Sequence, residues 1–270
     1  MRRSHCAHKS MERGIVSTAI APTEFCVLPE SEEVPMTMQV GMVGKDGIVL
    51  ASDTRWTMKA RLENQSWAGA EFGVGSSKIK IDAKRGIAIA CAADMRSAQL
   101  FADAILAALK QEDFVHPEAV VRDTALKTLP DVTERTAPQC ILVLTRPSRR
   151  IFLCQFAYYN NKLAPECLEM ENLAIAGHNT NAAIFWAERY SRYFQEMTIK
   201  KLIPLASHLI VSAEMVNPGG VAGLEIAYCD RTGLHRLSKE KNRKWHSKAT
   251  AWDARITEMI LGHSARSKAK

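Results

Sequence analysis

Short apolar runs separated by turn-forming residues begin near Met36. The first two, MQVGMVG and GIVLASD, are separated by a stretch that includes Asp46-Gly47, a dipeptide typical of tight hairpin turns. The runs KIKID and GIAIACA form a second pair of the same kind. Between the pairs, residues 61–77 are rich in Gly, Ser and Ala and show no clear period, which predicts an extended loop. The pattern therefore predicts two β-hairpins joined by a loop.

Apolar positions change to helical spacing after the second pair of runs. Helical patterns lie around Phe101 and in a segment opened by Pro117. Strand-like runs return over 140–176, and two further helical patterns cover 180–196 and 199–214 before the strands GLEIAYCD and GLHRL. This order suits an α+β fold in which two antiparallel sheets pack face to face between helix pairs, a four-layer αββα sandwich.

Composition excludes several classes of protein. A chain of 270 residues, 47% of them hydrophobic, can bury a sizeable core, and one domain is the simplest division. No apolar run approaches the ~20 residues needed to cross a bilayer. The basic first ten residues are not followed by the continuous apolar segment of a secretory signal, so we expect a cytoplasmic protein.

Cysteine and histidine positions give no metal-binding pattern. The chain has seven cysteines, mostly within apolar runs such as CILVL and IFLCQF, which predicts buried thiols. There is no CxxC pair and no spaced His/Cys cluster, so we expect no metal and no cofactor. The cysteines are Cys6, Cys26, Cys91, Cys140, Cys154, Cys167 and Cys229.

The two ends of the chain differ from its middle. Residues 1–35 lack helical or strand periodicity and end in PESEEVP, which predicts a disordered extension, a propeptide or a mis-assigned start ahead of a domain over 36–238. The net charge of +7 is concentrated in the basic segment 239–270, which predicts a C-terminal helix or tail. Basic residues around Trp245 could bind phosphate beside a stacking ring, but no nucleic-acid-binding motif accompanies them. A solvated helix face is favoured, and nucleic acid is not an expected partner.

The segment MTMQVGMVGKDGIVLASDTRWT resembles the start of mature proteasome β-type subunits and their bacterial proteasome-like relatives, members of the N-terminal-nucleophile hydrolase superfamily. In that family a nucleophilic threonine opens the chain, a V-G-x-x-x-K-D-G hairpin follows, and an Asp-x-Arg lies on the second strand. These features match Thr37, Val40–Gly47, and Asp53 with Arg55. The lysine that opens the family's next strand matches Lys78.

The resemblance implies a threonine-type endopeptidase. A threonine hydroxyl is a weak nucleophile, so Thr37 would need its own free α-amino group as a base. Lys78 would lower the proton affinity of the hydroxyl, and Asp53 would hold that lysine charged and oriented. Backbone amides at Ala90 and Cys91 would supply the oxyanion donors, and no metal is required.

The sequence departs from the family pattern in two places. Gly177 is followed by His178 where the family has a serine, and the turn at Gly219 and Gly220 follows Pro218 without the usual Asp and Ser. Those groups normally orient the threonine amine. A catalytically silent ring subunit and an N-terminal-nucleophile amidase therefore remain alternatives.

The leading hypothesis is a peptidase subunit inside a self-compartmentalised ring. It implies a homo-oligomer that hydrolyses peptides or unfolded proteins, with an unfoldase as a further partner. Thr37 follows Met36, so removal of an initiating methionine would free its amine if translation starts there. Self-cleavage of a propeptide is disfavoured, because family propeptides commonly end in glycine.

Overall fold

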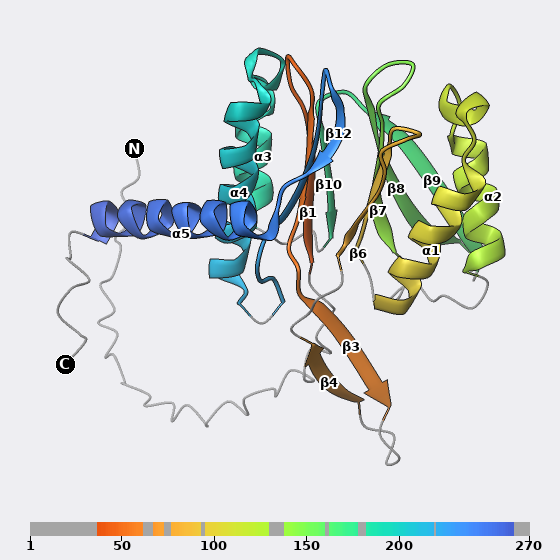
Figure 1. The fold of residues 1–270 in the computed structure, drawn as a ribbon. Coiled ribbons are helices and arrows are strands. Elements are labelled where there is room, and N and C mark those ends of the chain that lie inside the picture. Colours follow the sequence, from red (N-terminus) through yellow and green to blue (C-terminus); the bar gives the residue numbers. More distant parts are fainter. Residues whose placement is uncertain are drawn as a thin grey trace, which may run out of the picture. The chain divides into compact units, whose positions relative to one another are not determined.

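The computed structural model describes most of the chain and assigns its helices and strands (Figure 1). Within the described ranges the chain forms twelve strands, five α-helices and two short 3-10 helices. The described ranges are 37–61, 67–72, 77–92, 95–129, 138–159, 162–177, 182–218 and 220–261.

The first sheet has five antiparallel strands in the order β10-β1-β2-β11-β12. Its strands are β1 (Met38–Val43), β2 (Ile48–Ser52), β10 (Leu173–Gly177), β11 (Glu225–Asp230) and β12 (Gly233–Arg236). The hairpin expected at Asp46-Gly47 is confirmed, because β1 pairs with β2 and the N–H of Gly44 donates to the carbonyl of Gly47 at 2.7 Å. A Cβ atom at Gly47 would lie 1.9 Å from the Cys229 carbonyl oxygen, so only glycine fits this turn.

The second sheet also has five antiparallel strands, in the order β5-β6-β7-β8-β9. The pairing of KIKID with GIAIACA expected from the sequence is confirmed, since Ile79 lies opposite Ala90. The strands are β5 (Ile79–Asp82), β6 (Ile87–Ala92), β7 (Gln139–Leu144), β8 (Arg150–Tyr159) and β9 (Lys162–Met170).

A third, two-stranded sheet corrects two expectations. Strands β3 (Trp56–Arg61) and β4 (Trp67–Phe72) pair antiparallel, so the loop predicted over 61–77 is wrong where β4 forms. Figure 1 shows this hairpin extending away from the two larger sheets. The α+β class holds, but the expected four-layer αββα sandwich of two sheets between helix pairs is wrong, because the chain adds this third sheet and a fifth helix, Lys239–Leu261, to the two sheets and two helix pairs. Strand β4, WAGAEF, forms by backbone pairing with β3 although its own sequence has no regular apolar alternation.

Helices pack on both five-stranded sheets. Helices α1 (Met95–Ala108) and α2 (Glu118–Thr128) bury Phe101, Ile105 and other apolar side chains against β6, β7 and β8. Helices α3 (Ala182–Ser191) and α4 (Ile199–Val216) bury Leu202 and further apolar residues against β1, β2 and β11. The short helices are η1 (Gln111–Phe114) and η2 (Phe194–Glu196).

The basic C-terminal segment forms helix α5 (Lys239–Leu261), which packs beside α4. Trp245 lies partly buried against the apolar cluster of the first sheet, and the Lys248 ammonium lies 4.7 Å from its ring centroid. The indole is therefore a packing residue rather than an open stacking surface. In the described part of the chain, no helix combines the length and apolarity needed to cross a membrane.

A third apolar cluster joins the two five-stranded sheets. Leu50 of the first sheet and Ala90 and Ile141 of the second belong to it, and all are buried. Because the two sheets meet through these residues, side chains at the ends of β2 and β5 come within reach of each other.

Candidate active site

The three residues expected to form a catalytic triad lie where strands begin or end. Thr37 immediately precedes β1 and Asp53 immediately follows β2. The antiparallel register pairs Gln39 with Ser52, so the start of β1 lies beside the end of β2. Lys78 immediately precedes β5 and reaches the first sheet from the second.

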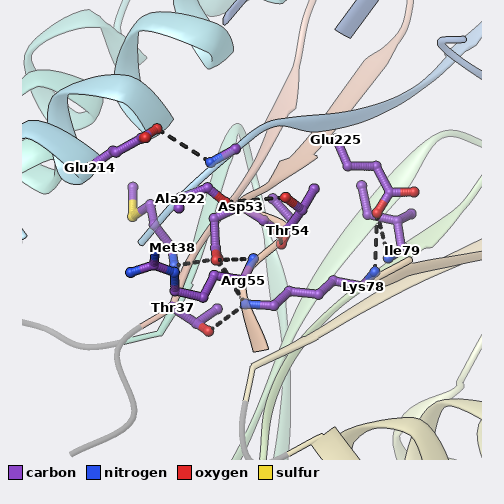
Figure 2. Close-up of polar contacts among 12 residues, drawn as sticks. Thr37, Met38, Asp53, Thr54, Arg55, Lys78, Ile79, Glu214, Ala222 and Glu225 are labelled. Carbon is purple, nitrogen blue, oxygen red and sulfur yellow. Dashed lines mark hydrogen bonds and ion pairs between the residues drawn. The ribbon is translucent and has the colours of Figure 1, made fainter. Parts of the chain in front are cut away.

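Lys78 joins the other two residues through its ammonium group. Figure 2 shows its side chain extended toward both of them. The Nζ atom donates to Thr37 Oγ1 at 2.7 Å and to Asp53 Oδ1 and Oδ2 at 3.0 and 2.9 Å. Thr37, Asp53 and Lys78 are only 6%, 0% and 2% exposed. The structure therefore brings all three side chains together in a buried cluster.

The carboxylate of Asp53 is fixed by the backbone around it. The N–H of Met38 donates to Oδ1 at 3.2 Å, and the N–H of Arg55 donates to Oδ2 at 3.0 Å. The N–H of Asp53 itself donates to the Met38 carbonyl at 3.1 Å. Both carboxylate oxygens thus have main-chain and lysine donors, as a buried charge requires.

Burial changes the proton affinity of the ion pair. Burial lowers the pKa of Lys78 below its ordinary value, and the neighbouring Asp53 carboxylate only partly offsets this. Burial likewise raises the pKa of Asp53, against the opposing effect of Lys78. A lysine of lowered pKa beside a hydroxyl can exchange a proton with it more readily than an exposed lysine.

Glu225 is a buried site residue that sequence reasoning missed. Its Oε2 atom accepts from the N–H groups of Lys78 at 3.1 Å and Ile79 at 3.4 Å, and the carboxylate also contacts Ser77 and the Arg236 guanidinium. It fixes the main chain that presents Lys78. The sequence feature that could have indicated Glu225 is an acidic residue at the start of the apolar strand EIAYCD, because a buried acid needs partners.

Trp56 is a second residue that was missed. The Lys78 ammonium lies 5.0 Å from the centroid of its ring, and the indole is 2% exposed. This cation–π contact adds an attraction on the Lys78 ammonium beside its hydrogen bonds. The sequence feature that could have indicated Trp56 is the presence of an aromatic residue three positions after Asp53.

The other expected site residues are placed as follows. Ala90 and Cys91 are buried in β6, and Ala90 lies opposite Ile79, the residue after Lys78. The Arg55 guanidinium donates to the Pro218 carbonyl. Gly220 donates its N–H to the Asn217 side chain at 3.1 Å. Gly219 and His178 lie outside the described residues.

Glu214 lies near the position where the family has an aspartate, and its carboxylate is engaged elsewhere. Its Oε2 atom accepts from the Gly223 N–H at 3.3 Å and lies 2.7 Å from Nε2 of His246, on α5. Figure 2 shows the contact with the main chain beyond Ala222. This acid therefore stabilises the loop between α4 and β11.

Gly177 allows β10 to approach Thr37 closely. Its φ of +117° suits glycine, and a Cβ atom there would lie 1.9 Å from the Thr37 carbonyl oxygen. Its N–H donates to Oε1 of Gln139 at 2.8 Å, which ties β10 to the second sheet. Across the described ranges, no group of three or more His, Cys, Asp or Glu side chains is arranged to hold a metal ion.

No known family profile and no curated protein sequence matches the chain. Solved structures of similar fold exist at low sequence identity. Anbu (ancestral beta-subunit) from Yersinia bercovieri has 11% identity and a TM-score of 0.58, over 86% of this chain and 100% of that chain. Anbu from Hyphomicrobium sp. strain MC1 has 16% identity and a TM-score of 0.57, over 86% and 100%. The Gly-1 mutant of the same protein has 16% identity and a TM-score of 0.57, over 84% and 98%.

The chain therefore shares its fold with Anbu proteins. The similar structures are Anbu proteins, which are relatives of proteasome subunits but are not proteasome β subunits. The resemblance to proteasome β-type subunits drawn from the sequence is wrong in this respect. The motif that carried the resemblance covers only Met36 to Thr57, a short part of the chain.

Proposed function

We propose that this protein is a threonine-type peptidase with Thr37 as its nucleophile. The observation that carries the proposal is the position of the Lys78 ammonium, which donates to both Thr37 Oγ1 and the Asp53 carboxylate. A buried lysine between a hydroxyl and an oriented acid supports nucleophilic catalysis, because it lowers the cost of removing the hydroxyl proton.

The proposed reaction uses Thr37 as the first residue of the mature chain. Its free amine accepts the hydroxyl proton while Oγ1 attacks the carbonyl carbon of a peptide bond, and Lys78 stabilises the developing charge on Oγ1. Asp53 keeps Lys78 charged and oriented. Main-chain N–H groups at Ala90 and Cys91 stabilise the oxyanion. The peptide C–N bond then breaks, the leaving amine takes the proton held by the Thr37 amine, and water hydrolyses the acyl-enzyme to free Thr37.

The proposed setting is a homo-oligomeric ring in the cytoplasm. The fold shared with Anbu proteins, described as ancestral beta-subunits, supports self-association. Enclosure of the site would restrict access to peptides and unfolded chains, and an unfoldase would then deliver larger substrates.

The test combines N-terminal sequencing with trapping by a peptide epoxyketone, which reacts with both the amine and the hydroxyl of an N-terminal threonine. The protein is purified from its native host, and intact mass is measured before and after reaction. We expect a chain that begins at Thr37 and carries one adduct, with no adduct on a Thr37→Ala variant. A chain that retains residues ahead of Thr37 and takes up no adduct would overturn the proposal.

A second candidate is a catalytically silent subunit of the same kind of assembly. The engagement of Glu214 with Gly223 and His246, and of Asn217 with Gly220, favours it, because these polar groups already have hydrogen-bond partners other than Thr37. Light scattering distinguishes the two candidates when combined with the trapping experiment. An oligomer without adduct or peptide hydrolysis supports the silent subunit.

A further inference from the structure

Four cysteines lie in register across four neighbouring strands of the second sheet. Cys91 of β6 lies opposite Cys140 of β7, Cys140 lies opposite Cys154 of β8, and Cys154 lies opposite Cys167 of β9. Cys154 and Cys167 are 13 positions apart and Cys91 and Cys140 are 49 apart, and the strand register brings all four into one row. We call them the cysteine row.

The side chains of the cysteine row share one face of the sheet. Cys91, Cys140 and Cys154 belong to the buried cluster beneath α1 and α2, and Cys167 packs at its margin. The sulfur atoms of Cys91 and Cys140 lie 2.8 Å apart, and those of Cys154 and Cys167 lie 3.5 Å apart. Cys167, on the edge strand β9, is the one partly exposed member.

The geometry favours bonds between pairs of thiols over a shared metal ion. Neighbouring strands lie ~4.8 Å apart, so four side chains in a row span about three such spacings and cannot converge on one tetrahedral ion. Directly opposite residues in a sheet have Cβ atoms roughly 4.5–5.5 Å apart, close to the separation that a disulfide requires.

We propose that the cysteine row is a thiol–disulfide relay that takes up oxidising equivalents at Cys167 and stores them as a disulfide between Cys91 and Cys140. The oxidant is a peroxide. Cys167 sulfur attacks a peroxide oxygen, the O–O bond breaks, and the products are a sulfenic acid on Cys167 and water or an alcohol. Cys154 sulfur then attacks the Cys167 sulfur, the S–O bond breaks, and the hydroxide leaves as water with the Cys154 proton.

Two exchange steps move this outer disulfide inward without further oxidation. Cys140 sulfur attacks Cys154, the bond to Cys167 breaks, and Cys167 regains a proton from Cys140. Cys91 sulfur next attacks Cys140, the bond to Cys154 breaks, and Cys154 regains a proton from Cys91. The result is a Cys91–Cys140 disulfide and two regenerated outer thiols.

Burial sets the direction of the relay. Peroxide reaches the partly exposed Cys167 before the three buried thiols. Burial and the contact with Cys91 raise the pKa of Cys140, and the contact with Cys167 and burial raise the pKa of Cys154. A raised pKa leaves Cys140 and Cys154 little thiolate with which to attack free peroxide, whereas each lies directly opposite a neighbouring cysteine with which it can exchange. The relay does not depend on the proposed hydrolysis.

Peptide mapping under non-reducing conditions tests the relay in the full chain with Cys6 and Cys26 replaced by serine. The reduced protein receives one equivalent of hydrogen peroxide, and free thiols are then alkylated in denaturant. We expect the Cys91–Cys140 linkage as the main product, with Cys229 alkylated as an internal control, since Cys229 is buried in the first sheet. In Cys167→Ser, formation of that linkage should slow by an order of magnitude.

Cys91→Ala supplies a second test that leaves the entry residue Cys167 in place. The relay then has no acceptor for its last step, so a disulfide that includes Cys154 should accumulate. Three results would overturn the proposal: an inner disulfide formed equally fast in Cys167→Ser, an outer Cys154–Cys167 disulfide that persists in the unsubstituted row, or sulfinic acid at Cys167 with three thiols unchanged.

Discussion

Buried polar side chains are divided unequally between the two five-stranded sheets. Strands of the first sheet bury Gln39, Ser52 and Glu225, and the buried residues Thr37 and Asp53 lie at their ends. Within the described residues, strands β5 to β9 of the second sheet bury only aliphatic, aromatic and thiol side chains. One sheet thus carries hydroxyl, amide and acid groups, while the other is an apolar support.

The two sheets are joined at the candidate site by polar contacts that cross between them. Lys78, immediately before β5, is the charged residue that the second sheet supplies to the site. It forms an ion pair with Asp53, which follows β2 of the first sheet. Glu225 of β11 accepts from the main chain at Lys78 and Ile79. The site therefore forms only when the two sheets are packed, so its polar contacts can be used to measure that packing.

The largest expected effect on stability comes from breaking the ion pair between Lys78 and Asp53, which joins the two sheets. Lys78→Met leaves the Asp53 carboxylate buried without its cation, and we expect a loss of about 3–5 kcal/mol in the free energy of unfolding. Chemical denaturation monitored by tryptophan fluorescence measures it. Peptide hydrolysis, if present in the parent chain, should be abolished in the same variant.

The double variant Asp53→Asn/Lys78→Met is the matched control. It removes both charges together, and replacing a buried ion pair by neutral groups of similar volume is often nearly neutral for stability. We expect it to recover most of the stability lost in Lys78→Met. A double variant that is as unstable as the single variant would contradict the view that the unpaired carboxylate causes the loss.

The same control isolates the pH dependence of the ion pair. The pKa of Lys78 is lowered in the folded state, so between that value and the ordinary 10.5 the unfolded chain holds more protons and stability rises with pH. The pKa of Asp53 is raised from the ordinary 3.8, so stability falls as pH rises through the window above 3.8. Both slopes should disappear from the double variant.

Sequence patterns predicted what is encoded locally. The hairpin motif identified Thr37 and Asp53, which lie beside each other because β1 and β2 are joined by a short turn. The motif that opens KIKID identified Lys78. Periodicity also predicted the helices that pack on the sheets, because each carries an apolar stripe.

What the sequence left open depends on contacts between distant segments. Glu225 lies 147 positions from Lys78, and nothing local shows that β11 runs beside β5. The cysteine row likewise appears only once the register of β6 to β9 is known. The β3–β4 hairpin was missed because β4, WAGAEF, carries no regular alternation of apolar and polar residues, although WTMKAR of β3 does alternate.

A smaller effect is expected from weakening the second contact between the sheets. Glu225→Gln removes the charge that holds two main-chain N–H groups and the Arg236 guanidinium. Hydrogen bonds to charged groups contribute about 1.5–3 kcal/mol, so the free energy of unfolding should fall by about that amount. Glu214→Gln is the control, because Glu214 is partly exposed and, among the described residues, its carboxylate contacts Gly223 and His246 and not the second sheet. If both variants lose the same free energy of unfolding, the contact of Glu225 with the second sheet contributes no more to stability than the contacts of Glu214.

The smallest effect has the opposite sign and concerns Gln39. Its side chain is 0% exposed, and neither amide atom has a hydrogen-bond partner among the described residues. An unsatisfied buried amide costs about 1–3 kcal/mol, and methionine has a similar unbranched shape without that cost. We therefore expect Gln39→Met to raise the free energy of unfolding by about 1 kcal/mol.

Ser52→Ala tests whether that gain is specific to an unpaired group. Ser52 lies opposite Gln39 on β2 and is equally buried, but its hydroxyl donates to the Asp53 carbonyl at 2.9 Å. Removing a satisfied group should lower stability by about 1 kcal/mol, while removing the unsatisfied amide raises it. If both substitutions lower stability, the Gln39 amide has a partner in solution, and the polar face of the first sheet is fully satisfied at this position.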